Sequence, residues 1–279
     1  CLAMTNWDLL AIAAVLLIGV PHGGLDGAVA RRVGWPDGVL AWLGFHLGYI
    51  LLAALVVVLW WHWPTPSLAV FLCISGLHFG RSDILDPASA ADEKVSQYWL
   101  PLIAHGGLVS IAIPSLKPDL VAPLFGILIG DEAGAALTNT IAMLWTTWLL
   151  AVFAYCAYAW FVPVWRKPLF SLLILLALVF LLPPLVSFAL YFCLWHSRRH
   201  TVRIWQSLQD ETERKRSFVE ATLYSLMAWV SAGVFFIYFH DSFSETLIQL
   251  TFIGLAALTV PHMLLVDIAD RLKARRELS

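Results

Sequence analysis

Residues 39–61 read "VLAWLGFHLGYILLAALVVVLWW" and contain no Asp, Glu, Lys or Arg. The hydrocarbon core of a bilayer is about 30 Å thick, and one α-helix needs about 20 consecutive apolar residues to cross it. This stretch is therefore predicted to cross a membrane as a single helix.

The rest of the chain repeats this pattern. Of the 279 residues, 60% are hydrophobic and 13% are charged, and the mean hydropathy is +0.80; soluble domains have about 25% charged residues. The predicted spans are residues 7–20, 39–61, 68–80, 98–113, 141–164, 169–182, 185–205, 219–240 and 247–268. The predicted fold class is an all-α, polytopic membrane bundle of about eight or nine transmembrane helices, forming a single domain over residues 1–279. A nucleic-acid-binding signature is absent from the sequence.

The basic residues predict the orientation of this bundle. When the predicted spans are threaded with the N-terminus outside, all 17 Lys and Arg residues except Lys117 fall on one side. Loops that face the cytoplasm carry an excess of Lys and Arg. The chain is therefore predicted to be a multi-pass protein of the inner cell membrane, with its C-terminus in the cytoplasm.

Histidines gather at one predicted depth of this bundle. Of the nine histidines, all except His62 and His240 are predicted to lie in the cytoplasmic half: His22, His46, His78, His105, His196, His200 and His262. A single buried His in a membrane more often makes an interhelical hydrogen bond. Several at one depth favour a metal site, since imidazole is the commonest metal ligand in proteins.

The spacing of the histidines selects four candidate ligands. His196 and His200, in "LWHSRRH", are four residues apart and project from one face of a helix. His22 in "PHGG" and His78 in "GLHFG" lie in glycine-flanked motifs and are the best candidates to complete the site. Neutral imidazoles suit zinc, copper, iron and nickel, so the ligand type alone does not choose the metal.

Acidic residues recur shortly after three of the histidines. Asp26, Asp83 and Asp267 follow His22, His78 and His262 by four or five residues. A carboxylate often orients a metal-bound imidazole, but an Asp beside Arg at the membrane surface gives the same pattern. Both readings stay open for Asp26 and Asp83, and the surface reading is favoured for Asp267. The predicted orienting or supporting residues are Asp26, Asp83, His262, His46 and His105.

Four motifs in this order carry a resemblance to a known family. The motifs are "GVPHGGLD", "SGLHFGRSD", "WHSRRH" and "TVPHMLLVD". The chain resembles the Brp/Blh family of bacterial and archaeal membrane β-carotene 15,15′-dioxygenases over nearly its whole length. The resemblance implies a non-haem Fe(2+) enzyme that splits the central double bond of β-carotene with O2 into two retinals, often for a rhodopsin-type protein. It also implies iron ligands at His22, His78, His196 and His200.

Aromatic side chains beside the His196–His200 pair provide a candidate wall for a polyene tunnel. Tyr191, Phe192 and Trp195 lie within two turns of this pair, and a hydrocarbon substrate dissolves in the bilayer. The alternative is that these rings pack helices or lie at the membrane interface.

Two other function classes stay open at the level of sequence. A desaturase or hydroxylase of the di-iron membrane class uses about eight histidines in HxxxH and HxxHH boxes, whereas this chain has one HxxxH and no HxxHH. A proton-coupled transporter also buries His and Asp residues, but its site is expected near mid-membrane rather than towards one leaflet.

Overall fold

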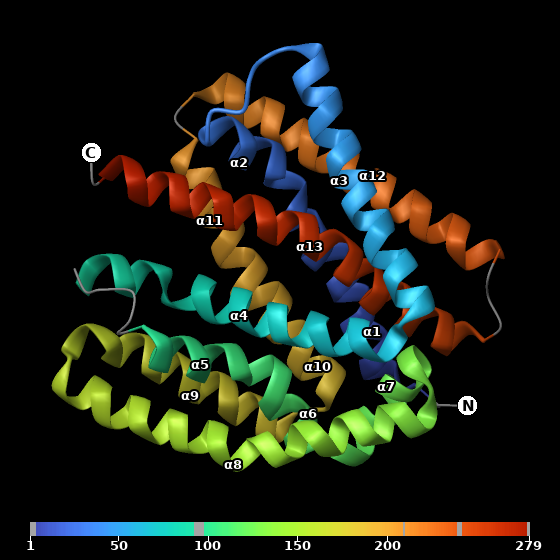
Figure 1. The fold of residues 1–279 in the computed structure, drawn as a ribbon, viewed down its shortest axis with the longest axis vertical. Helices are drawn as coiled ribbons and strands as arrows, with labels where there is room; N and C mark the ends of the chain where they lie inside the picture. The colour runs from blue at the N-terminus through green and yellow to red at the C-terminus, as the bar shows by residue number, and fades with distance from the viewer. Residues whose placement is uncertain (1–3, 92–97, 209, 239–241, 278–279) are drawn as a thin grey trace. The chain divides into compact units, whose positions relative to one another are not determined.

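The computed structural model describes residues 4–91, 98–208, 210–238 and 242–277. Every element in these ranges is helical, and the described part of the chain contains no strand (Figure 1). The predicted all-α class is therefore confirmed. The chain divides into two compact units: unit 1 comprises Cys1–Ala11 and Thr65–His196, and unit 2 comprises Ile12–Pro64 and Ser197–Ser279.

Helices long and apolar enough to cross a membrane account for most predicted spans. In the described part of the chain there are 7 such helices: Asn6–Arg32, Val39–His62, Trp99–Leu116, Asp131–Phe161, Pro163–Leu181, Glu211–Tyr238 and Phe243–Ala269. The chain is thus a multi-pass membrane protein by length and composition.

The two remaining predicted spans are also helical. Residues 68–80 lie in α4 (Pro64–Ala91), and residues 185–205 form α10 (Pro184–Ala189), the π-helix η6 (Leu190–Ser197) and α11 (Arg198–Ser207). The α4 helix carries His78 together with Arg81, and the second segment carries His196 and His200 together with Arg198, Arg199 and Arg203. Those polar residues lower the hydropathy of the helices that contain them.

Unit 1 is built around the long helix α8 (Asp131–Phe161), which packs against its neighbours in the sequence. Besides α4, α10 and most of η6, the unit contains α5 (Trp99–Gly107), η4 (Leu108–Ala112), α6 (Ile113–Leu116), α7 (Pro118–Ile129), η5 (Pro163–Trp165) and α9 (Arg166–Leu181). The chain turns between α7 and α8 at Gly130, whose φ of 92° favours glycine because it has no Cβ.

Glycines allow α4 and α5 to pack closely in unit 1. A Cβ added at Gly106 would lie 2.2 Å from the carbonyl oxygen of Gly76, and one at Gly80 would lie 2.3 Å from that of Leu102. Small residues that let helix backbones approach are typical of membrane helix pairs. The glycines that flank His78 therefore serve helix packing.

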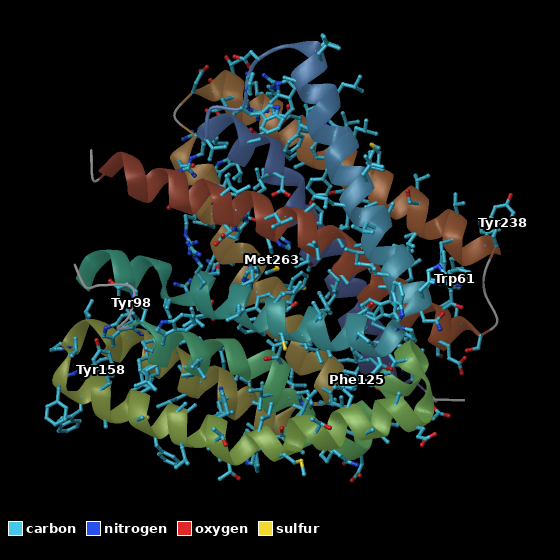
Figure 2. All side chains as sticks on the ribbon, in the orientation of Figure 1. Trp61, Tyr98, Phe125, Tyr158, Tyr238 and Met263 are labelled. Atoms are coloured by element: carbon cyan, nitrogen blue, oxygen red, sulfur yellow. The ribbon has the colours of Figure 1, made fainter. Side chains whose placement is uncertain are left out.

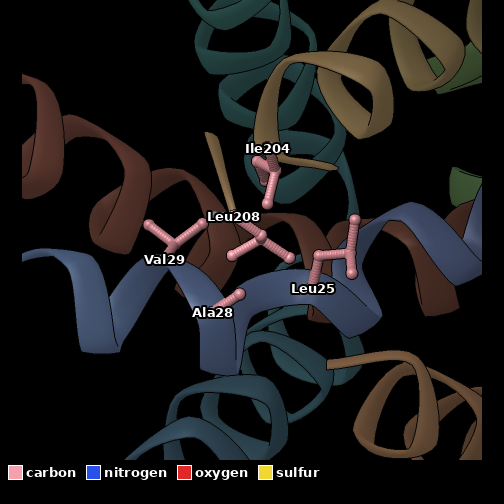
Figure 3. Close-up of a cluster of buried hydrophobic side chains, with 5 residues drawn as sticks. All are labelled: Leu25, Ala28, Val29, Ile204 and Leu208. Atoms are coloured by element: carbon pink, nitrogen blue, oxygen red, sulfur yellow. The ribbon is translucent and has the colours of Figure 1, made fainter. Parts of the chain in front are cut away.

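Unit 2 packs its N-terminal helical segments against its C-terminal helices. Its elements are η1 (Val15–Gly19), η2 (Val20–Leu25), α2 (Asp26–Arg32), α3 (Val39–His62), α11, α12 (Glu211–Tyr238) and α13 (Phe243–Glu277). The buried side chains of one apolar cluster join the η2–α2 region to α11 and the residue after it (Figure 3): Leu25, Ala28, Val29, Ile204 and Leu208.

The first span is longer than predicted. The helical run continues through the π-helix η1 and the 3-10 helix η2 to Arg32, whereas residues 7–20 were expected. Pro21 sits in the first turn of η2, where its missing N–H is tolerated. Asp26 is consequently buried inside this span, with 2% of its surface exposed.

The outer surface of unit 2 suits lipid. None of the most apolar window of α3 is buried within the protein. Trp61 and Tyr238, near the ends of α3 and α12, are 77% and 76% exposed (Figure 2). Aromatic side chains at helix ends are typical of membrane–water interfaces.

Candidate metal centre

Three histidine rings of unit 2 meet in one cluster. His22 is on η2, His200 on α11 and His262 on α13. The ring centroids are 5.8 Å apart for His22 and His200, 5.2 Å for His22 and His262, and 5.0 Å for His200 and His262. His200 and His262 are buried, and His22 is partly buried. Three elements that are distant in sequence thus place imidazoles side by side.

Hydrogen bonds fix the tautomers of two rings in this cluster. The Nδ1 of His22 donates to the carbonyl oxygen of Gly19 and lies 3.2 Å from the Ser197 hydroxyl. The Nδ1 of His262 donates to Asp26 Oδ1 at 2.7 Å. In each neutral ring the lone pair is then on Nε2, the arrangement typical of metal-binding histidines.

Asp26 joins three helices of unit 2. Its Oδ1 accepts the bond from His262, and its Oδ2 accepts a bond from the Tyr49 hydroxyl at 2.9 Å. The Tyr49 hydroxyl also lies 3.1 Å from the carbonyl oxygen of Leu258, one turn before His262. Tyr49 was not selected from the sequence; the only signal for it is a hydroxyl in an otherwise apolar span, three residues after His46.

His46 makes a separate polar contact in unit 2. Its Nδ1 donates to the Trp42 carbonyl at 2.6 Å, and its Nε2 accepts a hydrogen bond from the Tyr224 hydroxyl at 2.5 Å. Both ring nitrogens are therefore used in helix contacts. The role of His46 as a supporting residue of the metal site stays a prediction.

Unit 1 holds the other two predicted ligands side by side. The ring centroids of His78 on α4 and His196 on η6 are 5.1 Å apart. The ring of Phe79 packs 4.7 Å from that of His196, and His196 is 1% exposed. The pair therefore sits in an aromatic environment.

Asp83 is the counterpart of Asp26 in unit 1. It is 3% exposed and accepts hydrogen bonds from the Tyr191 hydroxyl at 3.0 Å and the Trp195 indole N–H at 3.1 Å. The Nδ1 of His105 lies 3.5 Å from Asp83 Oδ2, the oxygen that accepts from Tyr191. The carboxylate thus ties α4 to η6 and α5.

The three aromatic residues predicted to wall a tunnel have defined contacts in unit 1. Tyr191 and Trp195 direct their polar atoms to Asp83. Phe192 stacks on Phe188 with centroids 5.4 Å apart, and its ring lies 6.1 Å from that of His196. A substrate-contacting role for these residues stays a prediction.

The donor set fits a metal that prefers nitrogen ligands. Among the described residues, no group of three or more His, Cys, Asp or Glu side chains is arranged to hold a metal ion as it stands. Neutral imidazoles whose Nδ1 is bound to a carbonyl or carboxylate oxygen are nevertheless the donors expected for iron, zinc or copper. The predicted set of four draws His22 and His200 from unit 2 and His78 and His196 from unit 1.

Comparisons with known proteins point to one family. The sequence profile of the family described as "Beta-carotene 15,15'-dioxygenase" matches residues 13–270. A protein of that name from the uncultured marine bacterium 66A03 is 35% identical over 273 residues, which cover 95% of this chain and 94% of the relative. The "Probable beta-carotene 15,15'-dioxygenase Blh" of Halobacterium salinarum is 26% identical over 94% of this chain and 84% of its own length. No solved structure matches.

Proposed function

Because this chain belongs to the β-carotene 15,15′-dioxygenase family, we propose that it cleaves the central C15=C15′ double bond of β-carotene with O2 to give two molecules of all-trans-retinal. The observation that carries this proposal is the similarity to the marine bacterial relative over almost the full length of both chains. The buried histidines support it, because they provide nitrogen donors inside helices that suit a membrane-dissolved hydrocarbon.

We propose Fe(2+) as the cofactor, with His22, His78, His196 and His200 as its ligands. Membership of a dioxygenase family favours a metal cofactor, and imidazole nitrogen is a common donor for iron. When bound, iron would supply the activation of O2 that the cleavage of a carbon–carbon double bond requires.

The protein side chains hold and orient this site. Within unit 2 the carbonyl of Gly19 accepts from Nδ1 of His22, which places the lone pair of the ring on Nε2. Within unit 1 Asp83 fixes η6 against α4 and so holds His196 beside His78. None of these groups is required to act as a general acid or base, because the overall cleavage consumes no proton.

The surroundings of the reaction follow from the membrane setting. We propose that β-carotene reaches the site from the lipid phase, because a polyene is insoluble in water and the helices expose apolar surface. We also propose the inner cell membrane as the location, with the N-terminus outside and the C-terminus in the cytoplasm. A rhodopsin-type protein that binds the released retinal is the proposed partner.

The direct test uses purified protein loaded anaerobically with Fe(2+). Exposure to O2 in the presence of β-carotene is expected to give retinal, measured by chromatography, with about one iron bound per chain. His22→Ala is expected to lower retinal formation by at least about 100-fold, because removal of a ligand disables the metal. His62→Ala, which changes an exposed His at the end of α3, is the control and should retain activity.

Two results would contradict parts of the proposal. If the iron-loaded wild-type protein forms no retinal, the proposed activity is ruled out. Retinal formation that survives His22→Ala unchanged would remove His22 from the ligand set.

A further inference from the structure

We infer that His262 is a metal-binding residue, so that unit 2 alone presents three imidazoles, from His22, His200 and His262, to one metal ion. This inference rests on the proposed function, because it concerns the metal of the same site. It extends the proposed ligand set to α13 and assigns Asp26 and Tyr49 as the residues that position His262.

The spacing of the three rings matches that of imidazoles around one ion. With a metal–nitrogen bond of about 2.0–2.2 Å, each ring centroid lies about 3.3 Å from the metal, so two ligands at about 90–120° have centroids about 4.6–5.7 Å apart. The distances of 5.2 and 5.0 Å from His262 to His22 and His200 lie inside this range. The third distance, 5.8 Å between His22 and His200, corresponds to an angle slightly above this range.

The orientation of His262 also matches that of a metal ligand. A hydrogen bond from Nδ1 to Asp26 at 2.7 Å places the lone pair on Nε2. A carboxylate in this position fixes the tautomer and the angle of the ring. An ordinary interhelical hydrogen bond accounts for one nitrogen of His262, but it does not account for two further histidine rings whose centroids lie 5.2 and 5.0 Å from its own.

The chain of contacts continues behind Asp26. The Tyr49 hydroxyl donates to Asp26 Oδ2 at 2.9 Å, and Asp26 is 2% exposed. A buried carboxylate in a membrane helix is costly and needs such partners. Tyr49 on α3 therefore holds Asp26 on α2 by one hydrogen bond, and Asp26 holds the imidazole of His262 by a second.

The local sequence around His262 repeats that around His22. Val20-Pro21-His22 and Val260-Pro261-His262 share the same order of residues. In both segments proline removes a backbone N–H from the turn that carries the histidine. The same Val-Pro-His sequence thus precedes and contains both histidines, His22 and His262, of one cluster.

Cobalt binding tests this inference with a readout other than activity. The visible spectrum of bound Co(2+) reports the number and kind of its ligands. His262→Ala is expected to change this spectrum and to weaken Co(2+) binding by at least about tenfold. The control is His62→Ala, which removes an exposed histidine at the end of α3 in the same unit, and it should leave the spectrum unchanged.

Two further measurements keep the test decisive. In His262→Gly, added imidazole should restore the wild-type Co(2+) spectrum, because it can occupy the vacated position; a purely structural histidine would give no such recovery. If the substitutions at His262 prevent folding, the Co(2+) affinity of Tyr49→Phe tests the inference instead, with Tyr224→Phe as the matched control. Tyr49→Phe should weaken Co(2+) binding by up to about tenfold, and Tyr224→Phe should not.

The outcomes separate this inference from the proposed function. A folded His262→Ala protein that keeps the wild-type Co(2+) spectrum and affinity would overturn the inference. The proposed function would still stand if the wild-type protein forms retinal. Equal metal affinities of Tyr49→Phe and Tyr224→Phe would overturn it in the same way. Wild-type protein that binds neither Co(2+) nor Fe(2+) and forms no retinal would overturn both.

Discussion

Asp26 and Asp83 are nearly completely buried, and each accepts hydrogen bonds from side chains on other helices. A carboxylate inside a membrane protein is stable only when such donors replace water. Each Asp follows a predicted ligand, His22 or His78, by four or five residues. The same arrangement therefore occurs once in each unit, with the carboxylate holding the helix that carries the histidine.

Asp83→Ala is expected to destabilise the protein strongly. The substitution leaves the Tyr191 hydroxyl and the Trp195 indole N–H without their acceptor. A buried donor that loses its partner costs about 1–3 kcal/mol, so the free energy of unfolding should fall by about 2–6 kcal/mol. Thermal unfolding in detergent measures this change.

Tyr191→Phe provides the graded comparison for that experiment. It removes one of the hydrogen bonds to Asp83 and leaves the Trp195 bond in place, so the loss should be about 1 kcal/mol. Equal melting temperatures for Asp83→Ala and the wild type would show that Asp83 does not hold these helices together.

At the scale of the elements, three π-helical segments lie beside buried or partly buried histidines. They are η1, whose last residue Gly19 bonds to His22, η4, which follows His105 within three residues, and η6, which contains His196. Single π-turns in helices occur frequently at functional sites. Because a π-turn changes the angular position of every later side chain, regular helical spacing misplaces the residues that follow it.

Gly106→Ala should disrupt the contact between α4 and α5. The new Cβ would lie 2.2 Å from the carbonyl oxygen of Gly76, and that neighbour is backbone rather than a movable side chain. Forcing the helices apart should cost about 1–3 kcal/mol and lower the melting temperature.

Gly233→Ala is the matched control on α12. A Cβ at this position meets nothing within 4 Å, and alanine favours a helix over glycine by about 1 kcal/mol. The control should therefore match or exceed the wild type in stability. If Gly106→Ala and Gly233→Ala have the same melting temperature, the close approach of α4 and α5 is not required for the stability of the protein.

For the whole molecule, hydropathy predicted the helical class and the approximate positions of the helices, because a bilayer dictates long apolar segments. The predicted depth and the spacing of the motifs selected the histidines and the carboxylates that the structure places beside some of them. It did not identify Tyr49 or the division into two units. Both depend on which helices pack together, and the sequence of a single helix does not specify its packing partners. The extension of the first span to Arg32 was missed because PHGGLD looked like a helix end.

The orientation of the whole chain in the membrane leads to the last prediction. Arg31 and Arg32 precede the connection from α2 to α3, whereas no Lys or Arg lies between α3 and α4. Cytoplasmic connections carry the basic residues, so the first connection should face the cytoplasm and the second the outside. Asp37 and Trp63 are exposed positions in these two connections.

Cysteine accessibility checks this orientation. In a variant whose natural cysteines are replaced by serine, Trp63→Cys in intact spheroplasts should react with a membrane-impermeant maleimide. Asp37→Cys should react only after the membrane is opened, because the cytoplasmic face is then exposed to the reagent. The reverse pattern would place the N-terminus in the cytoplasm and bring the basic connections outside. Reaction of both cysteines in intact spheroplasts would show that α3 does not cross the membrane, despite its uncharged apolar sequence.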